Sequence, residues 1–389
     1  MRTIKDILID LKNTTELIVD LAYSALLFDM EDIAEEVLDL ESKILDLLHE
    51  LRFLAIVSTR SRDVAKALSS ILQIGSASQK IGNAAGDVAA LVLRGFKLTR
   101  EIVKAIITQL EETLVKAVVS VEGEVANKTL GEVKLHTRTG MRVIAIKRGF
   151  EWIFNPNRDT KVLVGDVLFA RGDISGVPKF FEMVTGKRVE IEKEEVEIEI
   201  EDLDKAIDIL ADMKNLSELA VDLSYSSILY NNEDIAQEVA YLEERIDNMK
   251  FDLQYWVLKS SRYFKEEEIK TLIALLDLAY SSEQIADSAK EIAEIVLEKM
   301  DIHPIFLSAM KETDEVITMI EVKKGSKLHG KTLGEAKVET NTGMHVIAIR
   351  RGKKWITKPS AGTKVFAGDV LIAKGTRESE VLLRKLCSS

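Results

Sequence analysis

The segment TLGEVKLHTRTGMRVIAIKRG, from Thr129 to Gly149, decides the organisation of this chain because it occurs twice. It returns as TLGEAKVETNTGMHVIAIRRG, from Thr332 to Gly352, and 15 of the 21 positions are identical. Each copy holds a run of β-branched residues followed by an Arg-Gly pair, a pattern typical of a strand that ends in a turn. Recurrence of whole motifs in the same order indicates a tandem duplication.

The duplication also covers the preceding part of the chain, at an offset of about 202 residues. The sequence DLAYS at 20–24 returns as DLSYS at 222–226. Asp29 and Asn231 stand where helix N-caps are expected. The residues that follow predict bundle helices. In the first copy, apolar residues step by four and three at Ile33, Val37, Leu40, Ile44, Leu47 and Leu51.

Each copy has a helical part and a β-rich part, which predicts an α+β, multi-domain fold. We expect two antiparallel helical bundles that alternate with two small α+β domains in a tandem duplication. The expected domains are a bundle at 1–118, an α+β domain at 119–176, a linker at 177–202, a bundle at 203–313, and an α+β domain with a C-terminal tail at 314–389. Within the linker, apolar residues alternate with glutamates at 187–202, which fits either an exposed strand or an extended acidic segment.

The composition excludes several classes of protein. The 389 residues include one cysteine, Cys387, so disulfide frameworks, cysteine-rich zinc sites and iron–sulfur clusters are excluded, and a reducing compartment is expected. The longest apolar runs fall far short of the ~20 residues that a membrane-spanning helix needs. The amino end, with Lys5, Asp6 and Asp10, does not resemble a cleaved signal sequence. A cytoplasmic protein is expected.

Charge is distributed unevenly between the two kinds of domain. The net charge of −12 divides into −4 for residues 1–118 and −12 for 203–313, against +2 for 119–176 and +6 for 314–376, with −5 for 177–202 and +1 for 377–389. Acidic bundles disfavour nucleic-acid polymers and suit cations, whereas small basic domains suit an anionic ligand or partner. The alternative interpretation is that these are ordinary charged surfaces.

The β-rich parts resemble a known family. The first copy contains Lys128-Thr129-Leu130-Gly131-Glu132, then Gly140, Val143-Ile144-Ala145-Ile146, Arg148-Gly149, Pro156 and Gly165-Asp166-Val167-Leu168, and the second copy fits equally well. This pattern resembles the TrkA carboxy-terminal domain, also called RCK_C. The resemblance implies a ligand-sensing domain of potassium channels and transporters that pairs with another copy of itself. No Gly-rich dinucleotide fingerprint is present, so redox sensing through NAD is not expected.

The helical parts resemble, more weakly, the bundles of PhoU-like proteins, in which acidic pairs on a helix can hold metal clusters. The combination is similar to archaeal potassium-channel-related proteins in which both modules alternate. Carboxylates four residues apart share one helix face and suit a hard cation. The candidate ligands for a divalent or iron-type metal are Glu16, Asp20, Glu218, Asp222, Glu283 and Asp287. The first copy has Gln79 and Asn83 in place of the last pair, so the second bundle is the better site. The alternative is a solvated acidic helix face.

Polar residues beside the shared glycines Gly140 and Gly343 are candidates for ligand binding. Related domains bind small anionic ligands such as cyclic dinucleotides where two copies meet, and the resemblance places four donors there: Arg138, Arg142, Asn341 and His345. Guanidinium, amide and imidazole groups can hold phosphates. A free histidine titrates near pH ~6.5, so we expect binding to weaken above that pH. The alternative is that they are ordinary surface and interface residues.

Catalysis has little support in the sequence. The five histidines form no metal-ligand spacing, and no G-x-S-x-G or phosphate-binding loop is present. We expect a non-enzymatic cytoplasmic regulator of cation transport, with potassium as the favoured ion, that acts as a homodimer at the cytoplasmic face of a channel or transporter. The alternative is a PhoU-like metal-binding adaptor in phosphate or other ion-transport signalling.

Overall fold

The computed structural model describes residues 2–110, 112–149, 151–189, 198–313, 315–357 and 359–388. They form two compact units, and each unit contains parts of both halves of the chain. The helical unit comprises Met1–Leu110 and Glu194–Thr313, and the sheet unit comprises Glu111–Lys193 and Asp314–Ser389. The folding units therefore do not coincide with the halves of the duplication.

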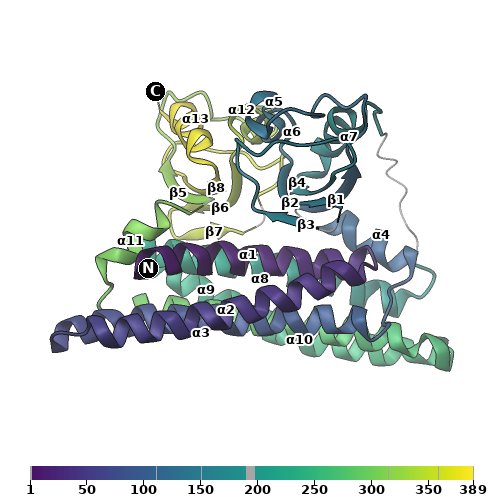
Figure 1. Ribbon diagram of the computed structural model, residues 1–389, viewed down its shortest axis with the longest axis horizontal. Coiled ribbons are helices and arrows are strands. Elements are labelled where there is room, and N and C mark those ends of the chain that lie inside the picture. The colour runs from purple at the N-terminus through teal and green to yellow at the C-terminus, as the bar shows by residue number, and fades with distance from the viewer. Residues whose placement is uncertain are drawn as a thin grey trace. The chain divides into compact units, whose positions relative to one another are not determined.

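The helical unit is built from six long helices and shorter connecting ones (Figure 1). The elements are α1 (Ile4–Leu27), α2 (Glu31–Ser58), α3 (Arg62–Leu93), α4 (Arg100–Gln109), α8 (Glu201–Tyr230), α9 (Glu233–Ser260), η2 (Ser261–Tyr263), η3 (Glu266–Glu268), α10 (Ile269–Leu297) and α11 (Pro304–Met310). Helices α1, α2 and α3 pack together as one bundle, and α8, α9 and α10 pack as its duplicate. None of the helices in the described ranges has an apolar segment long enough to span a bilayer.

The apolar stripe expected on α2 is confirmed as the buried face of that helix. All six of its residues, from Ile33 to Leu51, are buried. The expected N-caps are wrong by one residue. Asp29 and Asn231 adopt left-handed conformations, with φ of 50° and 45°. The N-cap position of the next helix is Met30 in the first copy, without a side-chain hydrogen bond, and Asn232 in the second, whose side chain accepts from the N–H of Ile235. Asp and Asn tolerate the left-handed conformation better than other L-residues, so they terminate the turn rather than start the helix.

The two bundles interlock through their last helices. The short helix α4 of the first half packs on α8 of the second half, and α11 of the second half packs on α1 of the first. Helices α3 and α10 pack against each other along the centre of the unit. Each half therefore covers an apolar surface of the other, unlike the expected arrangement of two bundles separated by a linker.

The sheet unit contains two four-stranded antiparallel sheets with the same topology. The first has the order β1-β4-β2-β3 and the second the order β5-β8-β6-β7. Its elements are β1 (Thr113–Val118), α5 (Leu130–Val133), α6 (Leu135–Thr139), β2 (Arg142–Arg148), β3 (Glu151–Phe154), β4 (Val167–Gly172), η1 (Ile174–Gly176), α7 (Val177–Thr185), β5 (Val316–Glu321), α12 (Val338–Thr342), β6 (His345–Arg351), β7 (Lys354–Ile356), β8 (Val370–Gly375) and α13 (Arg377–Cys387). Both sheets carry an irregularity at the same position, after Val143 in β2 and after Val346 in β6.

The borders of the first α+β domain differ from the expected ones. Strand β1 begins at Thr113, before the expected start at 119, and helix α7 occupies Val177–Thr185, inside the expected linker. Phe180 and Met183 of α7 are fully buried in the core of the first sheet. The second sheet has its own covering helix, α13, which buries Leu383 and Cys387. Half of the alternating segment at 187–202, namely residues 190–197, lies outside the described residues.

We expect Phe306→Ala in α11 to destabilise the helical unit by about 3–5 kcal/mol, because a buried aromatic side chain is lost and a cavity remains. Phe306 is fully buried, and its ring stacks on Tyr225 with the centroids 6.5 Å apart. The neighbouring Leu307 is 36% exposed, so Leu307→Ala is a matched control with a small effect. Urea unfolding measures both variants. A loss below about 1 kcal/mol for Phe306→Ala would contradict the buried packing of α11.

Candidate functional site

A polar pocket lies within the sheet unit, between residues 112–189 (the first β module) and residues 315–388 (the second β module). Charged side chains from both modules dominate its lining. The lining residues are Glu112, His136, Gly140, Arg142, Arg171, Glu315, Glu339, Gly343, His345, Lys374 and Gly375. The two copies therefore meet at a pocket, at the junction for which the sequence predicted a ligand site.

The pocket is assembled from the same positions of both copies. At an offset of 203 residues, the equivalent pairs are Glu112 with Glu315, His136 with Glu339, Arg142 with His345, and Arg171 with Lys374. The glycines Gly140 and Gly343 end α6 and α12 with φ of 72° and 73° and turn the chain into β2 and β6. Glycine adopts this conformation without strain, so both turns hold the following Arg142 and His345 at the pocket.

Glutamates from each module hold the cations of the other. Glu315 accepts hydrogen bonds from Arg142 at 2.6 Å and from Arg171 at 2.5 Å, both of which belong to the first module. In return, Glu112 of the first module lies 3.3 Å from the ammonium of Lys374. These exchanged ion pairs join the modules, and they also occupy the groups that an anionic ligand would need.

The charges in the pocket shift its titrating groups in opposite directions. Burial by itself would raise the pKa of Glu112, but Lys374 and Arg171 outweigh it and hold the pKa far below its usual range. Burial would lower the pKa of His345, but Glu339 and Glu112 raise it to about 9. The expectation that His345 loses its charge near pH 6.5 is therefore wrong. His136 moves the other way, because burial and the charge of Arg142 lower its pKa to about 4.

Two of the four expected ligand-binding residues lie outside the pocket. Arg138 donates to Glu124 at 2.5 Å and to the carbonyl of Val133 at 3.2 Å. Its equivalent, Asn341, donates to the carbonyl of Ala336 at 3.0 Å. Both side chains thus bond a backbone carbonyl five residues earlier, whereas Arg142 and His345 line the pocket.

Sequence reasoning missed Glu112, Glu315, Arg171 and Lys374. The available signal was their repetition: a glutamate directly precedes the first strand of each module, and a basic residue recurs near the end of β4 and β8. Only the folded sheet unit reveals their importance, because the antiparallel pairing of β1 with β4 and of β5 with β8 brings them to the same end of their sheets.

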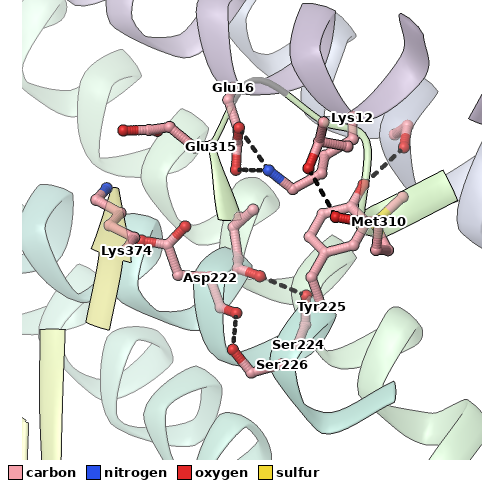
Figure 2. Close-up of polar contacts among 12 residues, drawn as sticks. Lys12, Glu16, Asp222, Ser224, Tyr225, Ser226, Met310, Glu315 and Lys374 are labelled. Carbon is pink, nitrogen blue, oxygen red and sulfur yellow. Dashed lines mark hydrogen bonds and ion pairs between the residues drawn. The ribbon is translucent and has the colours of Figure 1, made fainter. Parts of the chain in front are cut away.

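The acidic pairs of the first helices are already matched by lysines. Lys12 donates to both carboxylate oxygens of Glu16, at 2.7 and 2.8 Å (Figure 2). In the second copy, Lys214 pairs with Glu218 at 2.7 Å. Both ammonium groups are almost fully buried, with 3% and 5% of the side chain exposed. A cation that binds here must therefore displace a buried lysine.

The same lysines connect the two bundles. Lys12 lies over the ring of Tyr225 at 5.9 Å, and Lys214 lies over the ring of Tyr23 at 5.6 Å, so each contact joins one half to the other. The tyrosine hydroxyls also bond across the halves: Tyr23 with Ser282 at 2.7 Å, and Tyr225 with Ser78 at 3.3 Å. The acidic pairs therefore belong to a reciprocal, buried polar network.

The remaining metal candidates are partly occupied as well. Asp20 and Asp222 are buried. Glu283 accepts from Lys250 at 2.7 Å. Burial and the charges of Glu283 and Glu243 raise the pKa of Asp287 to about 6. Across the described ranges, no three acidic, histidine or cysteine side chains form a preassembled metal-binding group.

The raised pKa of His345 predicts how stability depends on pH. Between pH 6.5 and about 9, the folded protein holds this proton more tightly than the unfolded chain does. The stabilisation is therefore fully present below pH ~6.5 and is lost as the pH rises toward 9. We expect His345→Gln to flatten the decline of unfolding free energy over this interval. His49→Gln, at an exposed site on α2, is the control, and an unchanged pH profile for His345→Gln would refute the assignment.

Comparisons with known proteins agree with this architecture. The sequence model of the TrkA-C domain matches residues 114–185 and 317–388, and the model of the PhoU domain matches residues 210–296. "Potassium channel protein 1" from Methanocaldococcus jannaschii is 28% identical over 95 residues, which are 24% of this chain and 28% of that protein. The chain thus matches less than a third of the length of this curated relative.

Two solved structures resemble the chain at low identity. PhoU from Pseudomonas aeruginosa has 13% identity and a TM-score of 0.38, with 76% of this chain and 93% of that chain covered. The GsuK channel bound to NAD has 11% identity and a TM-score of 0.19, with 83% and 65% covered. Helices α1, α2 and α3 of the first bundle correspond in order to α8, α9 and α10, the helices of the segment that matches the PhoU domain. The chain therefore contains two TrkA-C domains, one in each half, and a PhoU domain in its second half.

Proposed function

We propose that this chain is a non-enzymatic regulator of cation transport that senses a small anionic ligand in the pocket between its two TrkA-C domains. The observation that carries the proposal is the pocket, where Arg142 and Arg171 from one domain and His345 and Lys374 from the other face the same small space. The name of the archaeal relative, a potassium channel protein, supports potassium as the ion and the cytoplasmic face of a channel or transporter as the place of action.

In this proposal, the ligand competes with the protein's own carboxylates. The pocket has room for about one water molecule while Glu112 and Glu315 occupy its cations. An anionic ligand enters when it replaces these glutamates at Arg142, Arg171 and Lys374. Both glutamates directly precede the first strand of their domain. When a ligand releases them, the backbone at the start of β1 and β5 is free to change its conformation. This change is the signal that the regulator passes to its partner.

We expect cyclic di-AMP, tested by calorimetry at low salt, to bind the wild-type protein and to bind Arg142→Ala at least about tenfold more weakly, because a charge-assisted hydrogen bond is lost. Arg138→Ala is the matched control, since Arg138 bonds Glu124 and a carbonyl away from the pocket. Affinity should fall with salt and only above pH ~9, where His345 loses its proton. No binding, or equal losses in both variants, would remove the ligand-sensing role.

The second candidate function is a PhoU-like metal-binding adaptor in phosphate or other ion-transport signalling. The observation in its favour is the group of carboxylates between α9 and α10, where burial, and after it the negative charges of Glu283, Glu243 and Asp247, raise the pKa of Asp287. A divalent or iron-type cation would relieve this repulsion. The match of the PhoU domain to residues 210–296 covers both helices.

Elemental analysis of protein purified without chelator tests the adaptor function. We expect iron, zinc or another divalent metal in the wild-type protein and its loss in Asp287→Asn, because that substitution removes the carboxylate at the centre of the repulsion. Asp252→Asn, an exposed acid on α9, is the matched control. A wild-type protein that is metal-free and takes up no added metal would eliminate this function.

A further inference from the structure

The hairpin between α2 and α3 extends past the start of α1. The guanidinium of Arg2, which precedes α1, lies 3.9 Å from the carboxylate of Glu50 in α2. The start of α1 therefore lies beside Glu50, and the rest of α2 continues beyond it. Beyond it, Ala55 is the last buried residue of α2, and Leu68 is the first buried residue of α3. Residues 56–67 thus contain no buried side chain. Residues 52–67 are called the α2–α3 tip below.

The α2–α3 tip exposes three large apolar side chains side by side. Phe53, Ile56 and Val57 are 59%, 74% and 64% exposed. Their spacing of three and four residues places them on one face of the last turns of α2. Scattered exposed apolar residues are normal, but a contiguous apolar patch on a surface indicates an interaction site.

The α2–α3 tip also contains four cations, and none of them is paired within the described chain. Arg52, Arg60, Arg62 and Lys66 are all exposed and make no ion pair or side-chain hydrogen bond with any described residue. Asp63 is the only acidic residue in the tip. The tip is therefore locally basic, although the first helical segment as a whole, residues 1–118, has a net charge of −4.

We propose that the α2–α3 tip binds the surface of an anionic lipid membrane. A stable protein interface takes about 20–30 residues on each side. The α2–α3 tip, with three exposed apolar side chains, is too small to form one by itself. Shallow insertion of apolar side chains at the headgroup level requires no complementary groove. Arginine and lysine beside the inserted residues reach lipid phosphates while their aliphatic stems stay against the acyl boundary.

The duplicated hairpin supplies a contrast within the same chain. Tyr255 and Leu258 occupy the positions of Phe53 and Ile56 and are also exposed. The cations nearby are engaged, however: Lys259 and Arg262 both pair with Asp202 at 3.0 Å. Exposed Glu266 and Glu268 follow them. Among its described residues, the second hairpin end therefore has one exposed cation without an ion pair, Lys265, where the tip has four, and we expect it to contribute little to the selection of anionic lipid.

Cosedimentation of the full chain with vesicles tests the proposal. We expect the protein to bind vesicles of phosphatidylcholine mixed with phosphatidylglycerol at low salt. Its affinity for vesicles of phosphatidylcholine alone should be lower by about tenfold or more. The double variant Arg60→Glu with Arg62→Glu should lose about tenfold or more in affinity for the mixed vesicles. Ile56→Asp should also release the protein, because its apolar contact is lost. Leu258→Asp, at the duplicated position, should bind like the wild type.

Three outcomes would overturn the proposal. The wild-type protein could bind both kinds of vesicle equally, or both tip variants could still bind the mixed vesicles as the wild type does. The third outcome is that light scattering shows a wild-type dimer and a monomeric Ile56→Asp variant. The last outcome would assign the tip to a second copy of the chain. Circular dichroism checks that the variants remain folded, which is expected because the altered side chains are exposed. The vesicles contain neither a transporter nor a nucleotide, so failure here leaves the proposed regulatory function untouched.

Discussion

Reciprocal contact between the two halves of the chain is the constraint on which both units depend. In the helical unit, each buried Lys–Glu pair lies against a tyrosine of the other half, as Lys12 does against Tyr225. In the sheet unit, Glu315 of the second half neutralises Arg142 and Arg171 of the first. A buried charge without its partner costs several kcal/mol. In the sheet unit, neither half would therefore keep its buried charges satisfied alone.

The same constraint explains why the pocket is both charged and narrow. The pocket brings equivalent residues of the two modules together, so the acidic position of Glu112 and Glu315 occurs twice. The basic position of Arg171 and Lys374 is duplicated in the same way. Like charges at such a junction repel unless opposite charges lie between them. Glu112 and Glu315 provide those charges and lower the energy of the unliganded pocket. In the proposed mechanism, a ligand has to bind the cations of the pocket more tightly than Glu112 and Glu315 do. Only an anionic ligand with several hydrogen-bond acceptors meets this condition.

The copies diverge at the positions to which we assign chemistry. The pocket has Arg142 in one module and His345 in the other, so the two sides of a bound ligand would meet different donors. Asp287 has Asn83 as its counterpart, and the unpaired Arg60 has Arg262, which pairs with Asp202, as its counterpart. The duplicated scaffold is symmetric because packing requires it, whereas exposed and lining side chains were free to change.

The sequence by itself determined the local elements and the two kinds of domain. Periods of two and of about 3.6 residues report which face of an element is apolar, and they correctly gave the α2 stripe and the strands around Val143 and Val346. Only the tertiary structure decided what covers each face. Two duplicate bundles have equivalent apolar stripes, so no pattern distinguishes packing within a half from packing across halves. The family resemblance placed Arg138 at the ligand junction together with Arg142. In the folded module the side chain of Arg138 turns to Glu124 and a backbone carbonyl, and of the two arginines Arg142 lines the pocket.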